Sequence, residues 1–188
     1  MKNKILVGIV VLILVGVGVW LYSNRDNKAV QETPEEGLLT TADFSILLPE
    51  GWQEADASTD FSVIAVNAAE EVTDAKAEAI NFKTYFAVNY DTLQGTSLAD
   101  YVPAFKAQIT QMDQGAVFSN ENKVTINNRE VTAFEVDMTQ EEIDFKVLVV
   151  LVKGDSDDLW IITFNTLEGN WNSYQELFAQ VVNSFQLK

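Results

Sequence analysis

The sequence predicts an α+β protein: an α/β/α sandwich with a central, mostly antiparallel sheet flanked by helices, preceded by one N-terminal transmembrane helix. Three observations lead to this prediction. Residues 5–22 form one uncharged, strongly apolar run. Residues 42–188 contain short alternating or apolar runs separated by turn residues, which is typical of strands joined by hairpins. Two further segments of this region repeat apolar residues at helical spacing.

The N-terminal run is long enough to cross a bilayer. Its 18 residues would span about 27 Å as a helix, close to the thickness of the hydrocarbon core. Trp20 and Tyr22 end the run, where interfacial aromatic residues are expected. We therefore predict an uncleaved signal anchor over residues 1–22. A cleaved signal peptide is the alternative, but the small residues that cleavage requires occur only inside the run, at residues 16–18.

Residues 23–41 differ from both of their neighbours. They are polar, contain Pro34 and Gly37, and show no apolar periodicity, which predicts a flexible acidic linker. An additional helix packed on the domain is the alternative. Lysine and arginine are equally frequent on the two sides of the apolar run, so their count does not fix the orientation. Because the short N-terminus resembles an export signal, we expect a single-pass cell-membrane protein with its C-terminal domain outside the cytoplasm.

The remaining residues, 42–188, are predicted to form one domain with about six or seven strands. Asn127 and Asn128 tolerate positive φ and predict a hairpin turn. Residues 154–158 predict a second turn, between two strands whose apolar runs are nearly continuous and therefore indicate cover on both faces. The predicted strands are residues 44–48, 61–66, 79–90, 124–126, 131–138, 143–153 and 159–165.

Two helices are predicted, one for each face of the sheet. The first covers residues 97–112, where Ser97 and Asp100 resemble a capping box. Pro103 argues for a later start, near residue 100, because proline is tolerated chiefly in the first turn. The second helix covers about residues 171–184, with an apolar side that includes Trp171 and Phe178.

Two short motifs resemble a known family. Residues 44–52 read FSILLPEGW, which is similar to the F-x-I-x-x-P-x-G-W opening of PsbP-like domains. That family includes the extrinsic photosystem II protein PsbP and bacterial DcrB-type lipoproteins. Residues 178–185, FAQVVNSF, resemble its terminal helix, and the turn at 127–129 falls where such domains carry a similar one. The resemblance covers about residues 43–187. It implies an α/β/α sandwich, extracytoplasmic placement and no established catalytic residues. We do not transfer the photosystem role of PsbP to this chain.

Composition excludes several chemistries. The chain has no Cys and no His, so it lacks thiolate and imidazole ligands, Ser-His pairs and disulfides. Its formal net charge of −16 argues against nucleic acid, because phosphate binding requires clustered lysine and arginine. The sequence contains no phosphate-binding glycine loop and no nucleophile elbow. The transmembrane helix stands where the resembling proteins carry a lipidated Cys or a cleaved leader.

Acidic clusters are the remaining polar candidates. The pairs at residues 70–71 and 141–142 lie in predicted loops and are interpreted as solvated charge. Asp155, Asp157 and Asp158 form a weak cation candidate, since hard cations prefer several oxygen ligands on a loop. A polar β-turn is the simpler interpretation of the same three residues.

Three tryptophans have two interpretations. Trp52, Trp160 and Trp171 could stack on a ligand, but such aromatic residues more often close a core. We therefore predict no catalytic, cofactor or metal residues and no enzyme activity. The expected function is that of a membrane-tethered accessory or protein-interaction module. Its partners would be the membrane, through residues 5–22, and another envelope protein with a neutral or basic surface. A small-molecule or lipid carrier and a carboxylate-based hydrolase are the alternatives.

Overall fold

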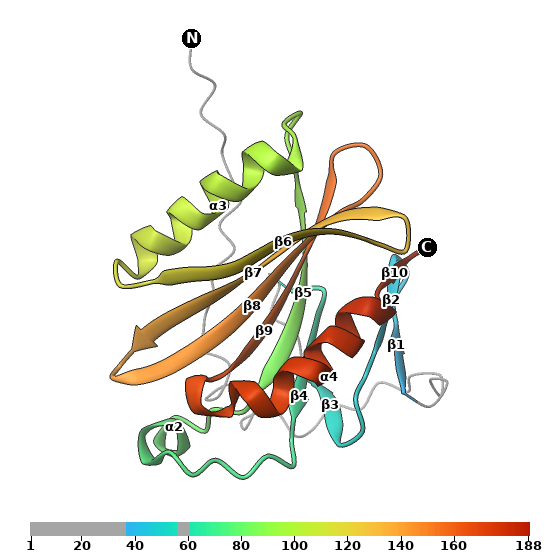
Figure 1. Cartoon of the computed structure of the whole chain (residues 1–188). Helices are drawn as coiled ribbons and strands as arrows, with labels where there is room; N and C mark the ends of the chain where they lie inside the picture. Colours follow the sequence, from blue (N-terminus) through green and yellow to red (C-terminus); the bar gives the residue numbers. More distant parts are fainter. Residues whose placement is uncertain (1–36, 56–60) are drawn as a thin grey trace.

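The protein is described by a computed structural model over residues 37–55 and 61–188. The predicted anchor, and the predicted linker up to residue 36, lie outside the described residues. Within those two ranges, no helix combines the length and the apolar character needed to cross a membrane. Seven antiparallel strands form the main sheet, in the order β3-β4-β5-β9-β8-β7-β6, and a smaller sheet has the order β1-β2-β10 (Figure 1).

The main sheet contains the longer strands. They are β3 (Trp52–Ala55), β4 (Val63–Asn67), β5 (Tyr85–Thr92), β6 (Val117–Ile126), β7 (Arg129–Gln140), β8 (Ile143–Lys153) and β9 (Asp158–Leu167). The small sheet contains β1 (Leu38–Thr40), β2 (Phe44–Leu47) and β10 (Gln186–Leu187). The helices are α2 (Ala75–Ala79), α3 (Leu98–Met112) and α4 (Trp171–Ser184), and a single 3₁₀ turn, η1 (Glu168–Asn170), precedes α4.

Two tight hairpins, β6–β7 at the edge of the sheet and β8–β9 near its centre, confirm the predicted turns. Asn127 and Asn128 have φ values of 49° and 63° and join β6 to β7, with Ile126 paired to Arg129. Two successive residues at positive φ give the twist that a two-residue hairpin requires. Gly154 begins the turn between β8 and β9, where a Cβ would lie 2.7 Å from the Cβ of Asp158, so only glycine fits there.

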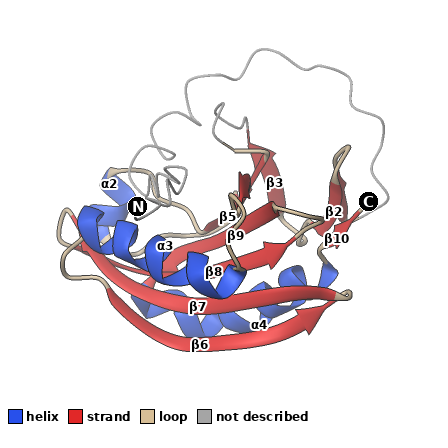
Figure 2. Cartoon of the chain, turned by 90° about the horizontal axis from the view of Figure 1, so that it is seen from above, coloured by secondary structure: helices blue, strands red, loops and turns tan. Residues whose placement is uncertain are grey.

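The two long helices cover opposite faces of the sheet, as predicted (Figure 2). Side chains alternate along a strand, and the two cores follow that alternation. Val147 and Val149 of β8 belong to the core that contains Phe105 of α3. Val150 of β8 belongs to the core that contains Phe178 of α4. The α/β/α sandwich is therefore present in the described residues.

The start of helix α3 also agrees with its predicted cap. The Ser97 hydroxyl accepts a hydrogen bond from the Asp100 backbone N–H at 3.1 Å and donates one to the Asp100 carboxylate at 2.6 Å. The helix begins at Leu98 and contains Pro103 in its interior. The later start near residue 100, suggested by that proline, is wrong because the cap fixes the first turn.

One predicted strand is wrong over its first half. Residues 79–84 were predicted to begin a strand, but the helix α2 ends at Ala79 and Asn81 has a positive φ of 52°. The Asp74 carboxylate caps α2 by accepting hydrogen bonds from the N–H groups of Lys76 and Ala77, which favours a helical turn there. The strand β5 therefore begins only at Tyr85.

Other elements extend beyond the predicted boundaries. Residues 38–40 fall inside the predicted linker, yet they form β1 and pair with β2. The predicted strand at 124–126 is the end of a longer strand that begins at Val117 and contains a bulge between Ser119 and Asn122. Strands β3 and β10 were not predicted, because both are short and only partly apolar.

Trp160 provides a test of the core on the α4 side. It lies on β9, the fourth of the seven strands, and is 7% exposed, with ring centroids 5.2 Å from Phe44 and 5.3 Å from Tyr90. Trp160→Ala should lower the free energy of unfolding by about 3–5 kcal/mol, because it leaves a large cavity. Urea titration measures this change. Val124→Ala on the exposed edge strand should change it by less than about 0.5 kcal/mol; equal effects would contradict the buried position of Trp160.

Tyr85 should make the fold sensitive to alkaline pH. Burial raises the pKa of its phenol well above the ordinary value of 10, so the folded state keeps a proton that the unfolded state loses. The free energy of unfolding should therefore be unaffected by this group below pH 10 and should decrease as the pH rises above 10. Thermal melts between pH 8 and pH 11 would measure this loss. Tyr85→Phe should make it smaller, and an unchanged loss would show that Tyr85 is not its source.

Candidate functional site

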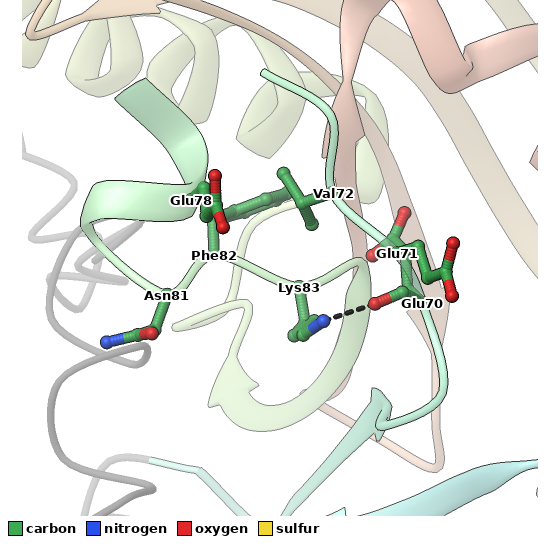
Figure 3. A pocket seen from close by; sticks show the side chains of 7 residues that line it. All are labelled: Glu70, Glu71, Val72, Glu78, Asn81, Phe82 and Lys83. Atoms are coloured by element: carbon green, nitrogen blue, oxygen red, sulfur yellow. Dashed lines mark hydrogen bonds between the residues drawn. The ribbon is translucent and has the colours of Figure 1, made fainter. Parts of the chain in front are cut away.

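A small pocket lies beside the segment that links β4 to β5 (Figure 3). Its volume is about 280 Å³, just below the usual range for small-molecule sites. Phe82 is buried at 3% exposure, and in Figure 3 its ring extends toward Val72. All the lining residues come from this one segment: Glu70, Glu71, Val72, Glu78, Asn81, Phe82 and Lys83. The pocket is therefore mixed in character, with apolar and charged walls.

Glu70 is the best-anchored polar group at this pocket. Its carboxylate accepts hydrogen bonds from the Thr84 backbone N–H at 2.5 Å and from the Thr84 hydroxyl at 2.8 Å. It also accepts one from the Tyr174 hydroxyl at 2.9 Å and one from the Asn170 amide at 3.4 Å. The Lys83 ammonium donates to the Glu70 backbone carbonyl. Glu70 thus fastens the β4–α2 connection to β5 and to the start of α4.

This arrangement corrects the interpretation of Glu70 as solvated loop charge. The neighbouring Glu71 is exposed, so the two members of the pair differ. Burial, followed by the negative charge of Glu70 and its hydrogen bond, raises the pKa of Tyr174, which keeps that phenol a donor. No feature of the sequence distinguishes Glu70 from Glu71, since the donors of the Glu70 carboxylate come from residues 14 and about 100 positions away.

The other predicted acidic pair remains at the surface. Glu141 and Glu142 form the turn between β7 and β8, with φ values of 51° and 62°, and both are exposed. Glu142 makes an ion pair with Lys76 at 2.6 Å. This is the solvated position that the sequence predicted for the pair.

Asp155, Asp157 and Asp158, the cation candidate at the β8–β9 turn, each accept a hydrogen bond from a different donor. Arg129 donates to Asp155 at 2.5 Å, and the Gly95 backbone N–H donates to Asp157 at 3.1 Å. The Tyr90 hydroxyl donates to Asp158 at 2.8 Å. Residues 37–55 and 61–188 contain no group of three or more carboxylates placed to hold a metal ion. The three aspartates instead connect the turn to neighbouring segments of the fold.

The three tryptophans close the core on the α4 side, which confirms that interpretation over a stacking site. Trp52 stacks on Phe86, with centroids 5.8 Å apart. Trp171 lies 5.9 Å from Phe178. Trp160 belongs to the same core cluster as Trp52. Aromatic pairs at such distances stabilise a core beyond the effect of area burial.

A further ionic group lies on β7 and β8 and was not found from the sequence. The Lys146 ammonium is 3.0 Å from a Glu135 carboxylate oxygen and 2.8 Å from one of Asp137. It also lies 5.5 Å from the centroid of the Trp171 ring. Burial lowers the pKa of Lys146, but the hydrogen bonds to Asp137 and Glu135 outweigh this effect and raise it. Lys146 therefore stays charged between two carboxylates.

The fold is that of PsbP. Cyanobacterial PsbP from Synechocystis has a TM-score of 0.61 at 16% identity, with 86% of this chain and 98% of that chain covered. LpqN of Mycobacterium tuberculosis has a TM-score of 0.58 at 11% identity, covering 77% and 83% of the two chains. The yeast protein Mog1p has a TM-score of 0.53 at 14% identity, covering 77% and 89%. No protein-family model matches the sequence, and the search of curated proteins finds no relative.

These likenesses define a class of architecture. The chain has a PsbP-like α+β fold, as the motifs at residues 44–52 and 178–185 suggested. At such low identities the comparison concerns the fold, and function has to be argued from the chain's own surface and charge.

Glu70 gives a direct test of the anchored connection. Glu70→Gln should lower the free energy of unfolding by about 1–3 kcal/mol, because hydrogen bonds to a charged acceptor are lost and an amide N–H then faces other donors. The adjacent Glu71→Gln makes the same chemical change at an exposed position and should cost less than about 0.5 kcal/mol. Chemical denaturation of both variants measures the difference, and equal costs would contradict the anchoring role.

Proposed function

We propose that this protein is a non-catalytic binding module, held outside the cytoplasm at a cell membrane by residues 5–22, that contacts another envelope protein. The proposal rests on one observation: large side chains fill the core on both faces of the sheet, and the domain around them is strongly acidic. Large side chains are fully buried on both faces of the sheet, among them Phe105 and Phe134 on the α3 side and Phe86 and Phe178 on the α4 side. Such an interior stabilises a rigid surface.

The described pocket supports this choice over the two alternatives. A carrier requires a deep apolar cavity, whereas this pocket is small and has Glu70, Glu78 and Lys83 in its walls. A hydrolase of the two-carboxylate type requires acids facing one another across a substrate cleft. The Glu70 carboxylate instead has its acceptor positions taken up by Thr84 and Tyr174.

Two similar structures agree with a binding role in the envelope. LpqN is involved in cell envelope biogenesis, and Mog1p is a Ran-binding protein. Proteins of this fold are therefore associated with envelope biogenesis and with protein binding. We transfer the general role to this chain and none of the individual partners.

Tethering would make a weak contact sufficient. A flexible linker over residues 23–36 would reach about 20 Å, so the domain would stay in the layer next to the membrane. Confinement of this kind raises the effective concentration of membrane-bound partners. Residues 37–188 carry 24 of the 28 acidic side chains and 8 of the 12 basic ones. This charge repels anionic headgroups and favours a partner with a neutral or basic surface.

The test compares the full chain with a variant that lacks residues 5–22. The full chain should resist carbonate extraction from membranes and co-purify with a membrane protein at low salt. The deletion variant should be released into the supernatant. Partner recovery should fall at 0.5 M salt, because the Debye length is then about 4 Å. Recovery of no partner, together with substrate turnover by the purified chain, would contradict the proposed function.

A further inference from the structure

On the side of α4, the two valines of β6, Val117 and Val124, are left exposed by the residues that the structure describes. Val131 of β7 belongs to the α4-side core, so Ala133, Glu135 and Asp137 face the same side by alternation. Across the β6–β7 ladder, Val117 pairs with Asp137 and Val124 with Val131. We call this surface the open face; its residues are Val117, Ser119, Asn122, Val124, Ala133, Glu135, Asp137 and Lys146. Lys146 lies at its border with α4, because its ammonium is 5.5 Å from the centroid of the Trp171 ring.

The open face is exposed along β6, half-buried along β7, and partly apolar. Val117 is 59% exposed and Val124 is 45% exposed, which makes them two of the large hydrophobic residues that the fold leaves in solvent. In Figure 1, α4 lies across the lower ends of β9 and β4 and does not cross β6. On the opposite side the equivalent position is filled by α3, where Phe105, Phe118 and Phe134 pack together.

The charge on this surface is acidic. Glu135 and Asp137 share the single cation of Lys146, so the three groups keep one net negative charge. Lys146 and Glu135 have 14% of their side-chain surface exposed, and Asp137 has 33%. A cationic side chain that reached Asp137 would therefore enter a partly desolvated position, where charge-assisted hydrogen bonds are stronger than in bulk water.

The edge of β6 is poorly suited to pairing with another strand. The ladder with β7 is interrupted by a bulge between Ser119 and Asn122, and Asn120 has a positive φ of 52°. Glu121 and Lys123 place charges in the middle of the strand. Bulges and charged residues are features that protect an edge from strand addition. A partner can therefore contact the face formed by β6 and β7, whereas the edge of β6 is protected from pairing with another strand.

We propose that the open face binds an amphipathic, basic helix of the partner protein, lying in the same layer as α4. This proposal rests on the proposed function and names the surface that performs it. A helix is about 10 Å wide, which matches two strands about 4.8 Å apart. Its apolar side would cover Val117, Val124 and Ala133, and its lysine or arginine residues would reach Asp137. A second copy of this chain is a poor occupant, because it presents the same acidic surface.

The experiment is site-specific photocrosslinking of the full chain in its own membrane. A benzophenone amino acid replaces Val124 or, separately, Val117, and the crosslinked peptide of the partner is sequenced by mass spectrometry. Gln111, exposed on α3 at the opposite face, carries the same probe as a control. We expect both valine positions to crosslink to one segment with apolar residues at helical spacing and an excess of lysine and arginine. Gln111 should not crosslink to it.

Charge variants test the acidic contact. Asp137→Lys should lower the crosslink yield at Val124 about tenfold, as expected when a charge pair across an interface becomes a repulsion. Asp137→Asn, which keeps the size of the side chain, should lower it less. Glu141→Lys makes the same charge change at the exposed β7–β8 turn and should leave the yield unchanged.

Several outcomes would overturn the assignment. A crosslinked segment that is extended and pairs with β6, a crosslink to a second copy of this chain, or equal yields for Asp137→Lys and Glu141→Lys would each do so. If Gln111 captures the co-purifying partner and the valine positions do not, the binding-module function stands and the open face is wrong as its site. If no position crosslinks and no protein co-purifies, both proposals fail.

Discussion

The burial of β9 on both of its faces is the constraint on which the rest of the fold depends. Leu159 and Ile161 point into the α3-side core, whereas Trp160, Ile162 and Phe164 point into the α4-side core. Each large apolar side chain contributes about 1.5–3 kcal/mol when it is removed from water, so neither face of this strand can be left exposed. Both faces of the sheet therefore need a helix. The α3 core extends to β7 and β6, where Phe105 and Phe118 contact Phe134, whereas the α4 side leaves Val117 and Val124 of β6 exposed.

That constraint also explains what the sequence could and could not predict. Strand β8 and strand β9 were found with nearly correct bounds because their apolar runs carry the signal of double burial. Helix α3 was found because its cap and its apolar period agree. The first half of β6 was missed because residues 117–123 are mostly exposed and polar, so no core-facing period marks them. The strand predicted over residues 79–84 failed because local capping by Asp74 favoured α2.

The polar groups were harder to predict than the elements, because their roles depend on contacts between distant residues. Glu70 and Glu71 are adjacent and chemically identical, yet only Glu70 meets the hydroxyl of Tyr174. Lys146 meets Glu135 and Asp137 only because the β7–β8 register places Asp137 opposite Lys146. A one-residue change in that register would move Lys146 to the other side of the sheet. Sequence patterns identify the strands, but they do not give the register that assembles such groups.

The uneven cover of the sheet separates the surfaces that hold the fold from the surface proposed to bind a partner. Side chains at the centre, such as Phe86, Trp160 and Phe178, belong to one hydrophobic core cluster, and their loss would destabilise the whole domain. Val117 and Val124 contribute little burial, so the fold does not require apolar residues at these two positions. Valine favours a strand conformation, but the contact of its exposed apolar surface with water is unfavourable. A partner that covers these two valines gives a physical reason for their presence.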